Sequence, residues 1–258
     1  MTMTSTLVDA LTAYALKTAE EWRKGWEEFR EKLREEYGDK ADDELVFYVC
    51  YSSVYIGVRP WPRLKLERFR SIMTLENALK IYREREYGED VLKSTVKGLA
   101  KIVDLGKRDA LANAIGFLVR EAEARDGRLR RYITEVRDAL DLQHRLSRIP
   151  GIGDKNAPIR VRDFVFCGLV KVDLRLIDIP AAPPTMRVLK RTGLIDNVED
   201  TGQACNVVRR EFNIVPMIAD CGLWKIGNEW CEMRTARRGE CMAYSCPIFH
   251  ICPKEPIP

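Results

Sequence analysis

The sequence predicts an all-α protein, and three observations lead to that class. Apolar residues recur every three or four positions through long stretches, which is the spacing of one buried helical face. Glycine, proline and aspartate interrupt these stretches at intervals that suit short connections between helices. With 46% apolar and 32% charged residues over 258 positions, the composition is that of a globular chain with one large or two small domains.

The N-terminal part is expected to hold one long helix and one shorter element. Helical spacing of apolar residues runs from about Thr6 to Tyr37, and Gly38 then ends the helix. The stretch from Leu45 to Val58 is rich in β-forming residues, so periodicity alone leaves strand and buried helix open. Its helical surroundings favour helix, and a turn follows at Arg59-Pro60-Trp61-Pro62.

The middle of the chain, from Leu64 to Leu146, is expected to form a succession of amphipathic helices. Breaks in the pattern separate these helices at Gly88, Gly106 and Asp126-Gly127. After a Pro-Gly-Ile-Gly turn a further helix runs to about Phe166, and Gly168 caps its C-terminus.

The last third is expected to begin with a loop. Val170 to Pro184 contains three prolines, which oppose helix because proline lacks the amide hydrogen. Met186 to Leu194 restores helical spacing, and a cysteine-rich tail begins near Trp230.

The charge balance does not by itself indicate a nucleic-acid partner. A net charge of +4 from 43 basic and 39 acidic residues means that any DNA-binding surface must come from local clustering. Because no secretory signal and no apolar run of membrane-spanning length occur, we expect a cytoplasmic protein without membrane contact. Scarce glutamine beside abundant Lys, Arg and Glu is typical of heat-adapted proteins, where cysteines form metal sites or disulfides.

The sharpest motif is Leu146 to Ala157, which reads Leu-Ser-Arg-Ile-Pro-Gly-Ile-Gly-Asp-Lys-Asn-Ala. Two helices joined by Pro-Gly-Ile-Gly form a hairpin whose glycines adopt backbone conformations that other residues avoid. The amides around Gly151, Ile152 and Gly153 can then approach a phosphate oxygen, helped by the N-terminus of the following helix. A plain helix–helix turn is the alternative interpretation.

Four cysteines near the C-terminus have the spacing Cys231-x9-Cys241-x4-Cys246-x5-Cys252. Four thiolates within 22 residues can enclose a [4Fe–4S] cluster or a zinc ion, and disulfides are the alternative. Three arginines between the first two cysteines are placed to grip a phosphate if metal holds the loop: Arg234, Arg237 and Arg238. The other four cysteines are expected to be core or disulfide residues: Cys50, Cys167, Cys205 and Cys221.

Together these motifs resemble the helix–hairpin–helix DNA glycosylases of the endonuclease III type, over roughly Met73 to Cys252. That family's hairpin reads Leu-Pro-Gly-Val-Gly-Arg-Lys-Thr-Ala, and its cysteines follow as Cys-x6-Cys-x2-Cys-x5-Cys, of which only the last spacing matches here. The resemblance implies two helical lobes with a DNA cleft between them, and a [4Fe–4S] cluster on the four cysteines. It also implies a nucleoid-associated monomer that binds duplex DNA carrying a damaged or mismatched base or an abasic site.

The resemblance further divides the chain into three segments. Residues 1–62 hold the N-terminal helix and a connecting segment, residues 63–229 the helix–hairpin–helix core, and residues 230–258 the cluster loop. Lys155 falls where bifunctional members carry their catalytic lysine, whose amine attacks the sugar of a flipped-out nucleotide and expels the base. The resulting Schiff base eliminates the 3′ phosphate. Such an amine must be neutral part of the time, as burial and nearby positive charge make it, and a phosphate-neutralising surface lysine is the alternative.

The family's catalytic aspartate has no counterpart at the expected position. It precedes an Arg-Val pair by five residues, and counting back from Arg187 reaches Ala182, a natural loss or an engineered substitution. Asp178 and Asp173, the latter 18 residues after Lys155, are the fallback carboxylates. The resemblance therefore implies a glycosylase with lyase activity in base excision repair whose excision step is impaired. A catalytically silent DNA-binding module and a monofunctional mismatch glycosylase are the alternatives.

Overall fold

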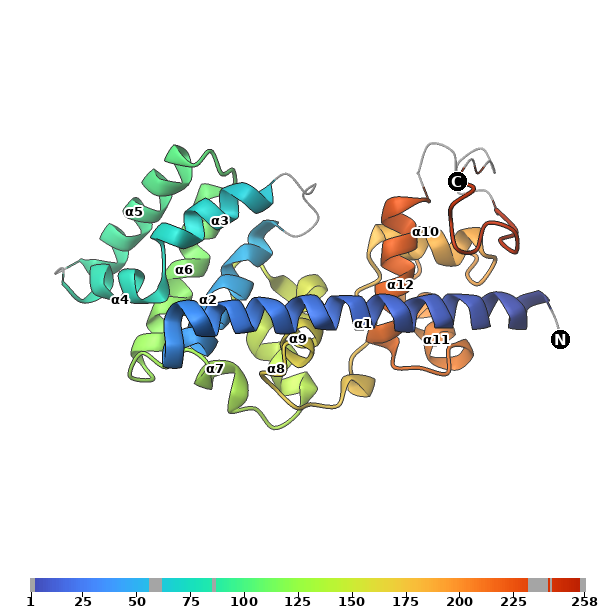
Figure 1. Ribbon diagram of the computed structural model, residues 1–258, viewed down its shortest axis with the longest axis horizontal. Coiled ribbons are helices and arrows are strands. Elements are labelled where there is room, and N and C mark those ends of the chain that lie inside the picture. The colour runs from blue at the N-terminus through green and yellow to red at the C-terminus, as the bar shows by residue number, and fades with distance from the viewer. Residues whose placement is uncertain (1–2, 56–61, 85–86, 232–240, 242, 256–258) are drawn as a thin grey trace. The chain divides into compact units, whose positions relative to one another are not determined.

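The computed structural model describes residues 3–55, 62–84, 87–231, 241 and 243–255. Within these ranges every regular element is an α-helix or a 3-10 helix and no strand occurs, so the all-α prediction is confirmed (Figure 1). In the same part of the chain no helix combines the length and the apolar character that crossing a membrane requires.

The chain forms two compact units. The central unit is Trp26–Val172, and the C-terminal unit joins Met1–Gly25 with Asp173–Pro258. Helix α1, Met3–Tyr37, contributes its first residues to the C-terminal unit and its last residues to the central unit. The boundaries of these units differ from those of the motif-based segments 1–62, 63–229 and 230–258. The reason is that a compact unit is defined by which helices pack together and not by their order in the chain.

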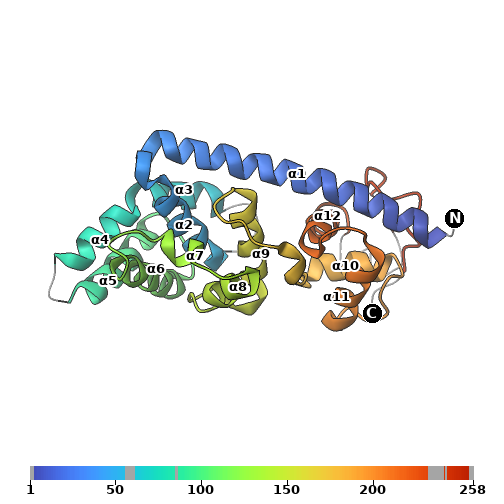
Figure 2. The same cartoon turned by 90° about the horizontal axis from the view of Figure 1, so that it is seen from below.

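The central unit consists of the end of α1 and a series of shorter helices. These are η1 Gly38–Lys40, α2 Ala41–Ser52, η2 Ser53–Tyr55, α3 Pro62–Ile72, α4 Leu75–Arg83, α5 Gly88–Ile102, α6 Arg108–Glu123, α7 Arg131–Thr134, α8 Ala139–Ser147 and α9 Gly153–Phe166. Helix α5 packs on α6, and α8 packs on α9, which lie side by side in Figures 1 and 2.

Most of the expected helix boundaries in this unit are confirmed. The long helix ends at Tyr37, and Gly38 follows it with a left-handed φ of +56°. The described part of the ambiguous Leu45–Val58 stretch is helical, as its surroundings indicated. Gly88 differs from expectation because it begins α5. A Cβ at Gly88 would lie 1.8 Å from the carbonyl oxygen of Tyr82, so only glycine fits there.

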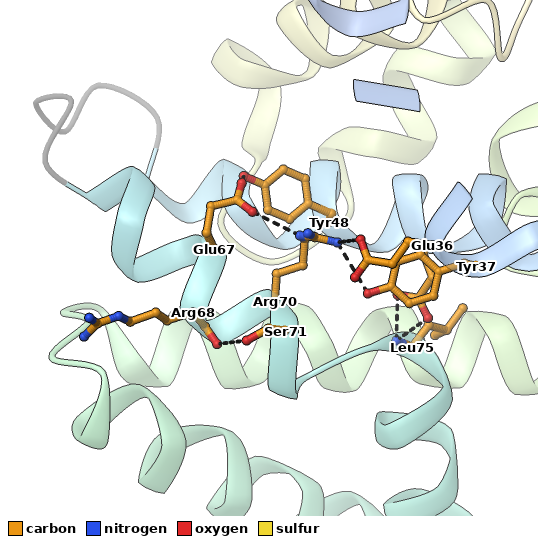
Figure 3. Close-up of polar contacts among 9 residues, drawn as sticks. Glu36, Tyr37, Tyr48, Glu67, Arg68, Arg70, Ser71 and Leu75 are labelled. Atoms are coloured by element: carbon orange, nitrogen blue, oxygen red, sulfur yellow. Dashed lines mark hydrogen bonds and ion pairs between the residues drawn. The ribbon is translucent and has the colours of Figure 1, made fainter. Parts of the chain in front are cut away.

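Polar contacts join four helices of the central unit, α1 to α4 (Figure 3). The guanidinium of Arg70, on α3, is 7% exposed and donates to Glu36 of α1 at 3.0 Å and to Glu67 at 3.2 Å. Glu44 of α2 accepts from the amide of Leu75, the first residue of α4, at 2.9 Å. A carboxylate at that position satisfies an otherwise unpaired amide and faces the positive end of the helix dipole.

The C-terminal unit packs three helices against the start of α1. They are α10 Pro183–Arg191, α11 Thr201–Glu211 and α12 Pro216–Glu229, preceded by η3 Leu174–Leu176. Gly222 and Gly227 allow α12 to approach its neighbours closely, since a Cβ would lie 2.6 Å from the Cα of Ala15 and 2.2 Å from the carbonyl oxygen of Pro184.

The expectation that the prolines before Met186 oppose helix is wrong at two positions. Pro183 and Pro184 are the first two residues of α10. The amides of a first helical turn have no partner within the helix, so a missing amide hydrogen costs little there. Helices α11 and α12 were not predicted from the sequence. The cysteine-rich tail follows the end of α12 at Glu229, close to the expected start near Trp230.

Candidate functional site: hairpin turn and four-cysteine loop

The turn between α8 and α9 has the backbone that its glycines predict. Gly151 has a φ of +87° and Gly153 a φ of +60°, both in the left-handed region. A Cβ at Gly151 would also lie 2.8 Å from Cγ2 of Val54, whereas the space around Gly153 is open. Ile152, between them, is 3% exposed and anchors the turn in the core. Gly151 is thus required by both conformation and packing, and Gly153 by conformation alone.

The outward side of this turn presents unpaired backbone amides. The amide of Ile152 donates to the carbonyl of Ile149 at 3.0 Å, which closes the turn. Among the described residues no backbone acceptor is found for the amides of Gly151 and Gly153. The N-cap of α9 is Ile152, whose side chain cannot cap. An anion placed here would meet free amides and the positive end of the α9 dipole.

Lys155 lies in the first turn of α9 and is exposed. Within the described part of the chain its amine makes no hydrogen bond or ion pair. Arg148, on the other side of the turn, is also exposed. Two cations therefore flank the free amides, an arrangement that can neutralise a phosphate. The burial that favours a neutral lysine amine is not provided by the neighbours of Lys155 in the central unit.

A side chain that sequence reasoning missed holds the far end of α9. Arg30, on α1, donates to both carboxylate oxygens of Asp42 at 2.8 Å and to the carbonyl of Cys167 at 2.9 Å. The hydrogen bond with Asp42 raises the pKa of Arg30. Since Cys167 is the C-cap of α9, Arg30 ties the helix of the hairpin to α1 and α2. No local pattern connects Arg30 with a residue 137 positions away.

The three candidate positions for a catalytic carboxylate lie in the C-terminal unit. Ala182 is the N-cap of α10 and makes no side-chain cap bond, and Ala181 before it has a left-handed φ of +45°. Asp178 forms an ion pair with Arg209 at 2.7 Å.

Asp173 forms an ion pair with Arg175 at 2.7 Å and accepts from its amide at 2.9 Å. The hydrogen bonds from Arg175 lower the pKa of Asp173. Both fallback carboxylates are thus paired with arginines, and Ala182 supplies no carboxylate.

The four cysteines of the C-terminal loop line one cavity. Its enclosed volume is about 20 Å³, and the surrounding space amounts to about 400 Å³ when the part open to solvent is counted. It is lined by Cys231, Cys241, Cys246 and Cys252 together with side chains of α10, α12 and the loop, among them Arg191, Trp230 and Phe249. Their spacing in the sequence predicts that these cysteines lie within reach of one another. In the fold all four line the same cavity.

Three of the four thiols that line this cavity are held away from their ionised form. Burial raises the pKa of Cys231 and Cys252, and raises that of Cys246 to about 11. The other thiols of the set raise these values further, whereas Arg191 lowers those of Cys231 and Cys252. A bound metal offsets such a cost because it stabilises thiolates. The donor chemistry therefore fits an iron–sulfur cluster or zinc.

Among the described residues no group of three or more His, Cys, Asp or Glu side chains is placed so that it could hold a metal ion. The four thiols nevertheless line one cavity.

Helix α10 holds both ends of the cysteine loop. Arg187 donates from Nε to the carbonyl of Cys231 at 3.0 Å and from its NH2 group to the carbonyl of Gly227 at 2.8 Å. At the other end, the carbonyl of Arg191 accepts from the thiol of Cys252 at 3.6 Å. In the sequence Arg187 served only to locate the aspartate position, and its contact with the cysteine loop became visible only in the fold.

The remaining predicted residues are accounted for briefly. Arg234, Arg237 and Arg238 lie outside the described residues. All eight cysteines are free thiols. Cys50, Cys167 and Cys221 are buried, which confirms the core interpretation for these three, and Cys205 is half-buried. Comparison of the chain with protein-family models and with curated proteins finds no match, so the family resemblance stays a prediction from its motifs.

Proposed function

We propose that this protein binds duplex DNA through its hairpin turn and belongs with the iron–sulfur DNA glycosylases that have abasic-site lyase activity. The observation that carries the proposal is the turn itself. Two left-handed glycines, free amides and the uncapped start of α9 lie between the exposed cations Arg148 and Lys155. This surface suits a phosphate of a DNA backbone, which would contact it without regard to base sequence.

The proposed lyase step uses Lys155 on a pre-formed abasic site. The neutral amine attacks C1′ of the ring-opened sugar, water leaves, and a Schiff base forms. Loss of a proton from C2′ then expels the 3′ phosphate, and hydrolysis releases the lysine. Lys155 is exposed in the free protein, so its amine is accessible to an abasic site in bound DNA.

Excision of an intact base is proposed to be slow. A positioned carboxylate facing the developing sugar cation contributes several kcal/mol, which is a factor of roughly a hundred to a thousand in rate. Ala182 provides no such group, and Asp173 and Asp178 are paired with arginines. These observations favour the second candidate, a DNA-binding module without excision activity.

The cluster is proposed to be structural in this scheme. Cys231, Cys241, Cys246 and Cys252 would hold it, and when bound it would cross-link the loop and fix its shape. Arg187 holds the backbone at the first cysteine of that loop. The arginines between the first two cysteines would then meet DNA phosphates.

Borohydride trapping on a duplex with one abasic site separates the candidates. A lyase gives a covalent protein–DNA species, and Lys155→Ala is expected to abolish it. Lys171→Ala is the matched control, since Lys171 is also an exposed lysine of the central unit, and it should cross-link like the parent. A parent protein that binds the duplex without any cross-link would favour the silent module. A Lys155→Ala variant that still cross-links would remove Lys155 from the mechanism.

A further inference from the structure

The cysteine loop carries a group of aromatic rings on its outer surface. The rings of Tyr244 and Phe249 have centroids 4.8 Å apart and a tilt of 52°, and His250 meets Phe249 edge-on at 5.2 Å. Phe249 is half-buried and lines the four-cysteine cavity. Tyr244 is 68% exposed, and His250 is also exposed. Phe249 therefore covers the cavity, and the other two rings extend this apolar surface into solvent.

A cation lies against the same rings. The amine of Lys254 is 4.1 Å from the centroid of Phe249, within the range of a cation–π interaction. Lys254 has a left-handed φ of +62°, which non-glycine residues rarely adopt. The loop sequence adds three more arginines between Cys231 and Cys241. Aromatic faces and positive charge thus occur together on one short segment.

Covering the cavity does not explain the whole group. Phe249 alone lies on the cavity side, and neither Tyr244 nor His250 lines it. The other tyrosine exposed to this extent, Tyr87 at 70%, has no aromatic neighbour among the described residues. An exposed ring such as that of Tyr244, beside a cation that can meet a phosphate, provides the elements of a surface that stacks unpaired bases.

We propose that Tyr244, Phe249, His250 and Lys254 form a stacking platform for unpaired bases of single-stranded DNA. The base would stack on the exposed ring of Tyr244, with Lys254 close to the adjoining phosphate. This inference goes beyond the proposed function, because it requires neither the hairpin turn nor any reaction at Lys155. If the protein does not bind single-stranded DNA through these rings, the borohydride result on duplex DNA is unaffected. If no cross-link forms on duplex DNA, the stacking proposal is likewise unaffected.

The test is fluorescence anisotropy with a labelled oligothymidylate of about twelve nucleotides, close to the site sizes of single-strand binders. Stacking on an aromatic side chain is worth about 1–3 kcal/mol per base, so Tyr244→Ala should weaken binding roughly 5- to 150-fold. Tyr244→Phe should bind like the parent because the ring remains. Tyr87→Ala is the matched control and should change nothing. The thermal unfolding of each variant shows whether the C-terminal unit is intact.

A second strand separates base stacking from phosphate attraction. An oligomer of the same length made of tetrahydrofuran spacers has the same charge, no bases and no aldehyde for Lys155 to attack, and the parent should bind it as weakly as Tyr244→Ala binds oligothymidylate. Lys254→Ala should reduce the slope of log Kd against log salt by about 0.7, whereas Tyr244→Ala should leave it unchanged. Equal affinity of the parent for both strands, or full affinity in a Tyr244→Ala variant that unfolds like the parent, would overturn the proposal.

Discussion

Ala182 occupies a position where an aspartate would serve two separate purposes. As N-cap of α10 it has extended backbone angles, φ −67° and ψ 151°, and an Asp or Asn side chain there can accept from the amide of Thr185. Pro183 and Pro184 have no amide hydrogen to offer, so Thr185 is the first donor of the helix. A change at this residue therefore affects helix stability as well as chemistry.

This residue gives a prediction with a built-in control. Ala182→Asp and Ala182→Asn should each stabilise the C-terminal unit by about 1 kcal/mol, since both side chains cap equally well. Only Ala182→Asp should accelerate base excision, by roughly a hundredfold or more, because only it adds a negative charge. Thermal unfolding and single-turnover excision on a panel of single-lesion duplexes measure the two effects. Equal excision by the Asp and Asn variants would show that the charge at 182 is not used.

Glu44 is a second residue whose environment sets its behaviour. It is 5% exposed, and burial raises the pKa of its carboxyl from 4.5 to about 7, although the amides of Leu75 and Glu76 lower it. A carboxyl whose folded pKa is raised binds its proton more tightly in the folded state. Its contribution to stability is therefore present at low pH and is lost as pH rises from about 4.5 to about 7.

Glu44→Gln should remove this dependence. The parent should lose roughly 3 kcal/mol of unfolding free energy between pH 4.5 and pH 7.5 from this group alone, and the Gln variant should lose that much less. Urea denaturation at several pH values gives the comparison. Glu84→Gln, a change at the exposed C-cap of α4, should leave the pH dependence in place. Parallel curves for the parent and Glu44→Gln would show that the amide hydrogen bonds outweigh burial.

At the scale of elements, the two glycines of the hairpin differ in why glycine is required. Gly151 is needed for its backbone conformation and for close packing, and Gly153 for its conformation alone. Gly151→Ala introduces both a strained φ and a contact of 2.8 Å with Val54, whereas Gly153→Ala introduces strain alone. The left-handed conformation costs a residue with a Cβ roughly 1–2 kcal/mol. Gly153→Ala is therefore the milder way to disturb the turn.

Gly153→Ala should weaken binding to duplex DNA by a similar factor for every sequence, because backbone amides contact phosphate and carry no base information. Gly25→Ala is the control, since Gly25 lies within α1, has free space around it and no left-handed φ. Titration of several unrelated duplexes with both variants measures the effect. A change of sequence preference in Gly153→Ala would contradict the phosphate-anchor role.

At the scale of the whole molecule, the cysteine loop decides whether the C-terminal unit contains metal. Protein purified without oxygen should be brown and hold about four iron and four sulfide per chain. Replacing Cys231, Cys241, Cys246 or Cys252 by Ser should abolish metal binding, whereas Cys50→Ser should retain it, since Cys50 is buried in the central unit. Metal analysis and visible absorbance give the answer. One zinc per chain without iron would rule out the cluster.

The sequence by itself determined the helical class, the left-handed glycines of the hairpin and the grouping of the four cysteines. These features are local, because helical periodicity, a glycine's backbone freedom and the spacing of nearby ligands depend on residues close together in the chain. By the same local reasoning, Pro183 and Pro184 are expected to oppose a helix. In the structure they begin α10, because a proline in the first turn of a helix lacks only an amide that has no partner within the helix.

Only the tertiary structure decided which side chains are already engaged and which remain available. Arg209 is 31 residues from Asp178, and Arg187 is 44 residues from Cys231, yet each forms a direct contact in the fold. Such pairings follow from how helices pack, and no periodicity in the sequence encodes them. The free amides at the hairpin, the pairing of Asp178 with Arg209 and the exposed ring of Tyr244 were settled by packing, because burial and long-range contact belong to the folded chain as a whole.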